Sequence, residues 1–506
     1  MGSDERAEIV FPVADDGRRS TVAAGRAVIA GALAQVDAAG AQAARDETDW
    51  RARYPAHLCR LTAAGLASRD AALTLARDGL AAMYAQLRLA RPGETETGLD
   101  TLISEPAGRR LSTVTVTGEG AAEPELSLPY RGSQLRGRDL LNQLATWVQR
   151  GIIEPSCADA VRAVAAHPEW LALPGRTVAV LGAGAEVGPL PALLAWGVRV
   201  AAVDLPVPGI WERVLGLTRH TAGTVLVPVP GDRPGSTGTG STSAGALTRE
   251  AGADLTGDVP AVADWLAALD GPLVAGNYVY ADGAANVRVS AAVDVLTRRL
   301  QAARPDAALA FLATPTDVFA VPGDAVAQSS RAYAGRPAPA RMSRSVLHAL
   351  SGGRLLSRAY PPGADPGICD SLIPQQGPNY ALAKRVQRWR ATVARQDGAV
   401  VSMNVAPPTR TRSVTKNRIL AAAYEGAHRF GVEVFEPATT RVLMAALLVH
   451  DLNAGPASAE GSLPWQDEAR SAAHGGLWRI AYAPRSALTL GVLAGYPAAI
   501  RRAGRH

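Results

Sequence analysis

The sequence predicts an α/β fold, in which a doubly wound parallel sheet follows an α-helical N-terminal domain. Between residues 176 and 408, short apolar runs alternate with stretches of helical length. Residues before that region are rich in Ala, Leu and Arg with helical periodicity. The 506 residues are also too many for one ordinary core. We therefore expect two domains, 1–170 and 171–506.

The N-terminal domain is expected to be mainly helical. Helical periodicity covers residues 20–46 and 56–92, and a further helical stretch covers 137–167. Between them, residues 108–120 are turn-rich and partly β-branched. No catalytic pattern is recognisable in this part of the sequence. We interpret it as a packing or dimerisation domain.

The second domain is expected to alternate strand and helix throughout. A Gly/Ser/Thr-rich stretch, 231–245, predicts a flexible surface loop. Residues 320–376 interrupt the alternation with Gly, Pro, Ser and Arg, which predicts an inserted lid or substrate-binding segment before the next helix. The expected strands are 177–182, 198–206, 223–230, 272–281, 307–315 and 398–408, and the expected helices are 186–197, 210–220, 259–271, 285–303 and 377–395.

The composition narrows the class of protein. Apolar residues make up 47% and charged residues 19%, as in a globular chain. Lys plus Arg exceed Asp plus Glu by 52 − 46 = 6, too small an excess to indicate nucleic-acid binding. Cys59, Cys157 and Cys369 lie far apart without metal-type spacing. The most apolar stretch, 487–500, is too short to span a bilayer. We expect a cytoplasmic protein without bound metal.

A glycine-rich turn after the first strand of the second domain indicates a nucleotide site. The sequence VAVLGAGAEVGPL places Gly182, Gly184 and Gly188 between a strand and a helix. There, backbone amides approach a pyrophosphate and the helix N-terminus adds favourable partial charge. Asp204 ends the next strand, where a carboxylate bonds both ribose hydroxyls and repels a 2′-phosphate. The pattern predicts a Rossmann-like dinucleotide site, and S-adenosylmethionine fits the same turn.

A tyrosine and a lysine lie four residues apart on the helix expected at 377–395. Tyr380 and Lys384 would share one face of that helix, one turn apart. A free phenol has a pKa near 10, and a cation about 4–6 Å away favours the phenolate. We interpret the pair as a proton donor beside the cation that lowers its pKa. An ordinary helix surface, with the phenol half buried, is the alternative.

These pieces, in this order, resemble the short-chain dehydrogenase/reductase family, whose active site is a YxxxK pair on this helix. The resemblance covers about residues 176–450. It implies that Tyr380 exchanges a proton with the substrate and that Lys384 holds the cofactor ribose. Thr314 would stand for the family's serine and stabilise charge on the substrate oxygen, with Thr316 as a competing candidate.

The resemblance implies further cofactor contacts. Asn286 would hold a water linking Lys384 to solvent, Asp254 in ADLT would contact the adenine, and Thr411 in APPTRT would contact the nicotinamide amide. The glycine turn departs from the family pattern because Glu186 replaces the middle glycine.

The leading hypothesis is an NAD(P)-dependent oxidoreductase of the short-chain type, which interconverts a ketone or aldehyde and an alcohol. Asp204 favours NAD(H), and NADP(H) stays open. The expected partner is a small-molecule carbonyl or alcohol, and the family implies a homodimer. One alternative is an S-adenosylmethionine-dependent methyltransferase, which leaves Tyr380 and Lys384 unexplained. The other is a non-catalytic nucleotide-binding protein.

Four arginines lie near the predicted site in sequence. In an Arg-rich chain they indicate a solvated, salt-bridged helix face, and a clamp for a substrate carboxylate or phosphate is the alternative. They are Arg385, Arg388, Arg410 and Arg412.

Overall fold

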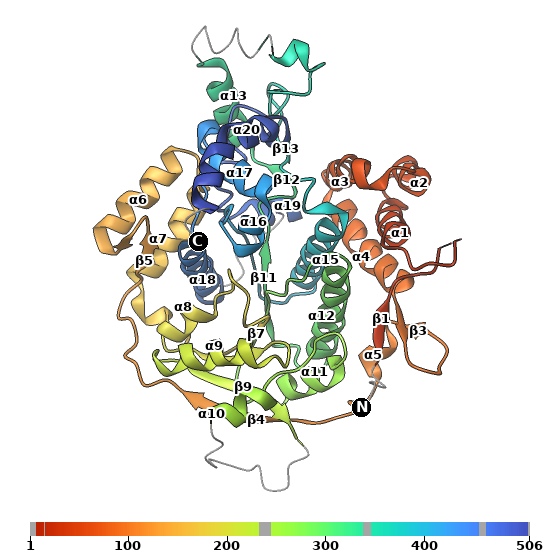
Figure 1. Ribbon diagram of the computed structural model, residues 1–506, viewed down its shortest axis with the longest axis vertical. Coiled ribbons are helices and arrows are strands. Elements are labelled where there is room, and N and C mark those ends of the chain that lie inside the picture. The colour runs from red at the N-terminus through yellow and green to blue at the C-terminus, as the bar shows by residue number, and fades with distance from the viewer. Residues whose placement is uncertain are drawn as a thin grey trace.

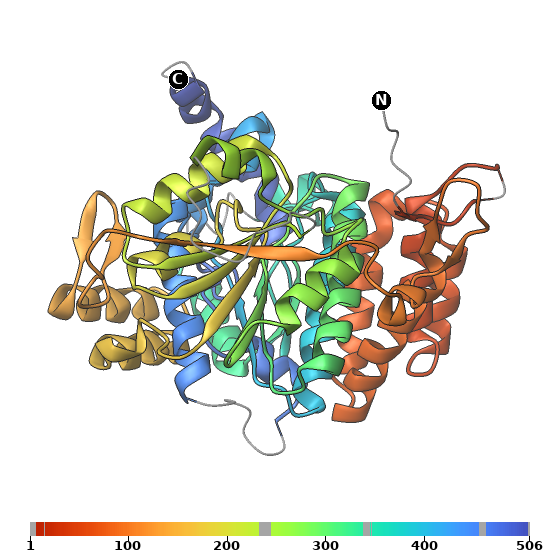
Figure 2. The same cartoon turned by 90° about the horizontal axis from the view of Figure 1, so that it is seen from below.

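A seven-stranded sheet with helices on both faces forms the centre of the molecule (Figures 1 and 2). The computed structural model is 51% helix and 15% strand, which shows the α/β class. Most of the predicted loop at 231–245 lies outside the described residues. The structure describes residues 7–14, 16–231, 244–336, 345, 347–454 and 462–503.

The strand order across the sheet is β14-β11-β10-β7-β8-β9-β4. Six strands run parallel, and β4 pairs antiparallel with β9 at one edge. Counted along the chain from β7, the parallel strands lie in the order 6-5-4-1-2-3, so their order reverses between β7 and β10. All six predicted strands are confirmed. The seven strands of the sheet are β4 (Leu111–Thr117), β7 (Thr177–Leu181), β8 (Arg199–Val203), β9 (Thr224–Pro230), β10 (Leu273–Asn277), β11 (Ala308–Ala313) and β14 (Val401–Val405).

Helices cover both faces of the sheet because its strands are apolar on both sides. Along β7, Ala179 and Leu181 belong to one hydrophobic core and Val178 and Val180 to the other. The first core contains α4, α11, α12 and α15, and the second contains α7, α8, α9 and α18 (Figure 1). Their bounds are α4 (Arg69–Gln86), α7 (Pro155–Ala166), α8 (Leu190–Ala195), α9 (Pro208–Arg219), α11 (Val259–Ala267), α12 (Ala284–Ala303), α15 (Gly377–Gln396) and α18 (Pro437–Ala454).

The helices predicted before residue 170 are present, and they pack against the sheet domain. At Gly79 in α4, an added Cβ would lie 2.6 Å from the ring of Trp389 in α15. The strand β4 comes from the same part of the chain. The segments on either side of residue 170 therefore share the sheet and both cores. The other elements of this part are β1 (Glu8–Val10), α1 (Thr21–Leu33), α2 (Ala38–Asp46), α3 (Trp50–Gly65), β2 (Arg88–Ala90), β3 (Thr97–Gly98), α5 (Thr101–Ser104), β5 (Leu128–Tyr130), β6 (Ser133–Leu135), α6 (Gly137–Gln149) and η1 (Pro168–Trp170).

The segment 320–376 lies between β11 and α15 in the chain. It contains α13, and its two short strands, β12 and β13, pair antiparallel outside the main sheet. None of the described helices is both long and apolar enough to cross a membrane. The remaining bounds are α10 (Ala244–Glu250), β12 (Val318–Val321), α13 (Gly323–Ala334), β13 (Gly367–Asp370), α16 (Arg412–Lys416), α17 (Arg418–Ala427), η2 (His428–Phe430), α19 (Pro464–Ala469) and α20 (Pro484–Ala503).

Candidate functional site

The predicted site residues gather at the carboxyl edge of the parallel strands. Gly182 directly follows β7, Asp204 directly follows β8, and Thr314 directly follows β11. In open α/β sheets, ligands bind outside the carboxyl ends of the strands, where the strand order reverses. That reversal lies between β7 and β10 in this sheet.

Tyr380 lies in the first turn of α15 and interacts with Thr314. Burial raises the pKa of Tyr380 to about 12. The nearby Thr314 hydroxyl opposes the rise, and the negative charge of Asp317 adds to it. The predicted lowering of this pKa by a nearby cation is therefore reversed. The phenol is protonated at neutral pH, which makes it a proton donor.

Thr314 is itself held in place by its neighbour. Its hydroxyl lies 2.9 Å from the hydroxyl of Thr316, and both side chains are buried. The two threonines treated as competing candidates thus form one hydrogen-bonded pair, and Thr314 is the one that acts on the pKa of Tyr380.

Lys384 is held by the end of β11 and by a neighbour on its own helix. Its Nζ donates to the carbonyl of Leu312 at 3.2 Å and to Oε1 of Gln387 at 3.0 Å. Gln387 is buried and donates in turn to Oδ1 of Asn277 at 3.4 Å. Burial lowers the pKa of Lys384 to about 8, partly opposed by the charge of Asp317. The ammonium is still mostly charged at pH 7, but it loses its proton just above that.

Gln387 is the site residue that the sequence motifs missed. The composition contains a signal that points to this part of α15. The chain has only two lysines, Lys384 and Lys416, against 52 − 2 = 50 arginines. A lysine in so Arg-rich a chain indicates that a compact ammonium is required at that position, rather than a planar guanidinium. The residue one turn further along α15 is then the natural partner for the ammonium.

Asn286 lies buried in the first turn of α12. Its Oδ1 accepts a hydrogen bond from the amide of Ala281 at 3.1 Å, which fixes the loop after β10. Its Nδ2 is buried and has no hydrogen-bond partner among the described residues. A buried amide donor in this state suits a water molecule or a ligand oxygen. The water link from Asn286 to Lys384 stays a prediction.

The glycine turn differs from the predicted phosphate-binding loop. Gly182 has φ +88°, and an added Cβ there would lie 3.0 Å from the carbonyl of Tyr278, so only glycine fits. The expected helix start at Glu186 is wrong, because α8 begins at Leu190 and has six residues. Without a helix starting at the turn, the favourable partial charge expected there is absent from this part of the described chain.

The amides of the three predicted glycines bond to the protein itself. Gly182 donates to the carbonyl of Val203 at 2.8 Å, and Gly188 donates to that of Ala185 at 3.1 Å. Gly184 donates to Oδ2 of Asp204 at 2.7 Å. A pyrophosphate on this turn would therefore have to replace bonds that the turn already makes.

Asp204 closes the glycine turn against the end of β8. Besides Gly184, it accepts a bond from the amide of Leu205, through Oδ1, at 2.8 Å. Burial raises its pKa, while both amide bonds oppose the rise. Asp254 lies close by, because Ala253 donates to the carbonyl of Asp204 at 2.9 Å. The Oδ1 of Asp254 accepts two bonds from Thr256 and so caps a local turn.

Glu186 ties the glycine turn to the segment that follows β14. Its Oε2 accepts a bond from the amide of Arg412 at 2.8 Å and lies 3.6 Å from the Nε of the same residue. Burial lowers the pKa of Arg441, and the negative charge of Glu186 opposes this shift. Thr411 precedes α16, and its hydroxyl lies 2.9 Å from that of Ser413. The two predicted cofactor-binding segments are therefore neighbours.

Two of the four arginines are buried, so the prediction of a solvated face is wrong for them. Arg385 and Arg388 donate to the two oxygens of Asp317 at 2.9 and 2.7 Å, and Arg388 also pairs with Glu468. Their partners lie far away in sequence. Arg410 pairs with Glu425 and Glu436, and Arg412 with Glu186.

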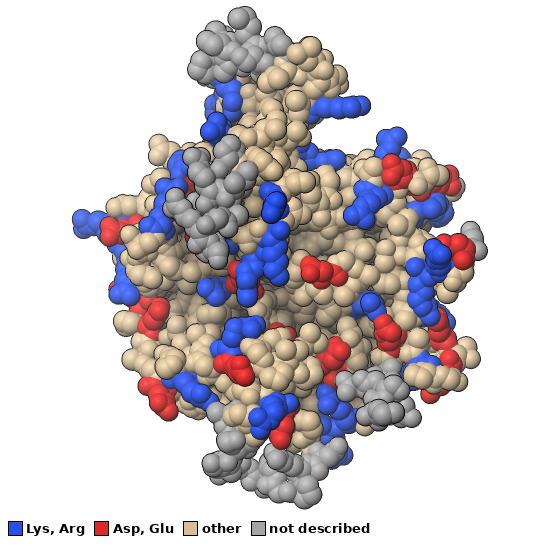
Figure 3. Space-filling view, in the orientation of Figure 1, with Lys and Arg blue, Asp and Glu red and all other residues tan. Residues whose placement is uncertain are grey.

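On the face shown in Figure 3, acidic and basic side chains are interspersed, and some basic ones lie beside a central hollow. Within the described ranges, no group of three or more His, Cys, Asp or Glu residues could hold a metal ion. In comparisons with known proteins, no family model, no curated protein and no solved structure matches this chain.

Proposed function

We propose that this chain is an NAD(P)-dependent oxidoreductase that interconverts a ketone or aldehyde and an alcohol. The observation that carries the proposal is that Thr314 lies close enough to Tyr380 to act on its pKa, at the carboxyl edge of the sheet. The strand order supports it, because 3-2-1-4-5-6 is the order of the Rossmann-like dinucleotide-binding sheet. Two hydroxyl groups there suit a carbonyl oxygen that gains negative charge.

The protein groups would act on one substrate oxygen. The nicotinamide supplies the hydride. Tyr380, protonated at neutral pH, donates its proton to the carbonyl oxygen, and Thr314 donates a hydrogen bond to the same atom. The ammonium of Lys384 would add positive charge on the same helix and would hold the ribose of the bound cofactor. A phenol pKa of about 12 keeps Tyr380 protonated at neutral pH, which is the form that carbonyl reduction requires.

Lys384 and Asn286 fit the cofactor better than the glycine turn does. Lys384 and Asn286 offer donors near the strand ends, and Asn286 has a free buried N–H among the described groups. At the glycine turn, the amides and Asp204 satisfy one another. The negative charge of Asp204 favours NAD(H) over NADP(H). A cytoplasmic location and paired subunits remain part of the proposal.

Calorimetry and turnover together test this function. We expect NADH to bind more tightly than NADPH, and S-adenosylmethionine not to bind. We expect Tyr380→Phe to lose at least about 100-fold in turnover with a panel of ketones and aldehydes while keeping NADH affinity. Tyr496→Phe, at an exposed tyrosine of α20, is the matched control. Binding of S-adenosylmethionine alone, or full turnover by Tyr380→Phe, would refute the proposal.

A further inference from the structure

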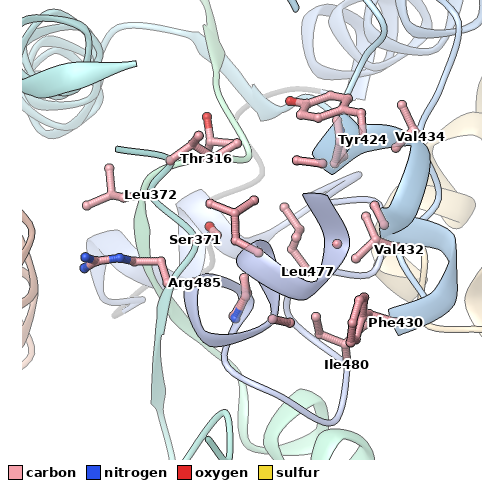
Figure 4. Close-up of a pocket in the computed structure, with 18 residues that line it drawn as sticks. Thr316, Ser371, Leu372, Tyr424, Phe430, Val432, Val434, Leu477, Ile480 and Arg485 are labelled. Atoms are coloured by element: carbon pink, nitrogen blue, oxygen red, sulfur yellow. The ribbon is translucent and has the colours of Figure 1, made fainter. Parts of the chain in front are cut away.

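An apolar pocket lies next to Thr316, the hydrogen-bonded neighbour of Thr314 (Figure 4). The space between its walls, counted out into the open solvent at its mouth, is about 600 Å³. Its walls come from the loop after β13, from α17 and the residues that follow it, and from α20. Most of the side chains that line it are aliphatic or aromatic, such as Ile373, Phe430, Val432, Leu477, Ile480 and Leu488.

One side of the pocket carries hydroxyl groups that connect it to the proposed reaction centre. Thr316 lines the pocket, and its hydroxyl lies 2.9 Å from that of Thr314, which lies close enough to Tyr380 to act on its pKa. Tyr424 also lines the pocket and lies close enough to Tyr380 for the two phenols to interact electrostatically. In Figure 4, the Tyr424 hydroxyl points to the side where Thr316 lies. Phe430 lies on the opposite side.

The other polar groups of the lining are already paired. Arg485 is the one charged residue among the described lining residues, and its Nη1 donates to Asp370 at 2.7 Å. The hydroxyl of Ser371 lies 2.7 Å from the carbonyl of Pro315 and donates to the backbone. Burial raises the pKa of Tyr424 above its ordinary value, so this phenol stays neutral. The pocket therefore suits a neutral ligand, since a charged one would lose its hydration without gaining a counter-ion.

We propose that this pocket binds the apolar body of a neutral carbonyl or alcohol substrate, whose oxygen lies at the Thr316–Tyr424 side. The inference rests on the proposed function, because it takes Tyr380 as the group that reacts with that oxygen. It names a substrate class: molecules with one oxygen function and a hydrocarbon chain or ring. Carboxylates, phosphates and sugars fall outside this class, because the lining offers neither free charge nor several hydrogen-bonding partners.

The wall formed by α17 and α20 has little freedom to move. An added Cβ at Gly426 would lie 2.0 Å from the carbonyl of Gly491, so the two helices touch backbone to backbone. At Gly491 itself, an added Cβ would lie 3.6 Å from the carbonyl of Ala423 and 4.0 Å from the ring of Phe430, which are ordinary contacts. The Cβ of a larger side chain at Gly491 therefore fits without a clash, and the rest of that side chain fills the pocket.

Binding is tested first without any cofactor, by displacement of the neutral dye Nile red. The competitors are 2-butanone, 2-hexanone and 2-octanone. Each added methylene is expected to tighten competition about fourfold, as burial of a CH₂ group in an apolar site predicts. Octanoate, which has the carbon number of 2-octanone but a negative charge, is expected to compete at least tenfold more weakly. Equal competition by short and long ketones, or by octanoate and 2-octanone, would overturn the inference.

Substitutions in the pocket lining test whether the dye and the ketones bind in this pocket. Gly491→Leu is expected to weaken binding of Nile red and 2-octanone at least tenfold. Ala494→Leu, three residues further along α20 and outside the lining, is the matched control and is expected to bind as wild type. Thermal melting checks folding, and Ala427→Phe replaces Gly491→Leu if the latter unfolds. Wild-type affinity in both pocket variants would also overturn the inference.

Turnover of the same ketones with NADH separates the two proposals. If longer ketones bind more tightly and none is reduced, the ligand class holds and the oxidoreductase proposal fails. If ketones are reduced with no dependence on chain length, the oxidoreductase proposal holds and the pocket inference fails. Reduction whose kcat/KM rises with chain length, and falls in Gly491→Leu, supports both.

Discussion

Lys384 donates a hydrogen bond to Gln387. We therefore expect that replacing the amide of Gln387 by a carboxylate raises the pKa of the lysine. In Gln387→Glu, a carboxylate replaces the amide whose Oε1 lies 3.0 Å from Nζ. Below its pKa of about 8, the ammonium then has a charged partner that stabilises it. We expect the pKa to rise. In Gln387→Met, the ammonium keeps the Leu312 carbonyl and loses the amide oxygen, so we expect the pKa to fall.

The size of the rise follows from two opposing effects. Two unit charges about 4 Å apart attract by about 4 kcal/mol at an effective dielectric constant of about 20, which equals about 3 pKa units. Gln387 is only 4% exposed, so its carboxylate replacement also loses hydration, which cancels part of that attraction. We therefore expect Lys384 to titrate about 1–2 units higher in Gln387→Glu.

Carbon NMR of protein labelled at the lysine Cε measures this directly. The chain has only two lysines, so the spectrum has two side-chain signals, and Lys416→Arg assigns them. We expect the Lys384 signal to titrate near pH 8 in the wild type. If Lys384 serves the reduction as proposed, kcat/KM falls as pH rises through that value, and the fall moves to higher pH in Gln387→Glu. A Lys384 midpoint in Gln387→Glu at or below the wild-type midpoint would refute the argument.

Three further predictions concern activity and stability. Thr314→Val removes a donor to the substrate oxygen, so steady-state kinetics should show a loss of about 100-fold in kcat/KM, whereas Thr314→Ser keeps most activity. Arg388→Met leaves Asp317 and Glu468 short of a buried partner, so urea unfolding should show a loss of about 3–5 kcal/mol; an unchanged midpoint would contradict this. Gly182→Ala forces a Cβ onto φ +88° and should cost at least about 1–2 kcal/mol, while Gly209→Ala, with nothing within 4 Å of its added Cβ, should be neutral or stabilising in the same assay.

The strands could be predicted from the sequence because their signal is local. β7 and β8 are short apolar runs bounded by turn residues, and a strand covered on both faces must be apolar throughout. The start of α8 could not be predicted in this way. The turn that contains Gly184 is stabilised by Asp204, twenty residues away, and those contacts keep residues 182–189 out of the helix.

The chemistry of the site was harder to predict than its location. The spacing of Tyr380 and Lys384 identified the helix face, but the sign of the Tyr380 pKa shift depends on what covers the phenol. The residues that bury the phenol are distant from it in the sequence. In the same way, Arg385 looked solvated by composition, yet it lies beside Asp317, which is 68 residues earlier in the chain. Burial of this kind follows from tertiary packing, which local patterns do not record.

The antiparallel strand β4 has a consequence for how the chain could be shortened. It pairs along the whole of β9 from Thr224 to Pro230, whose sequence TVLVPVP is mostly apolar. A fragment starting near residue 171 would lack β4. It would leave the unpaired backbone groups of β9 exposed at the edge of the sheet. The strand β4 therefore covers an edge of the sheet that would otherwise be open to pairing with another chain.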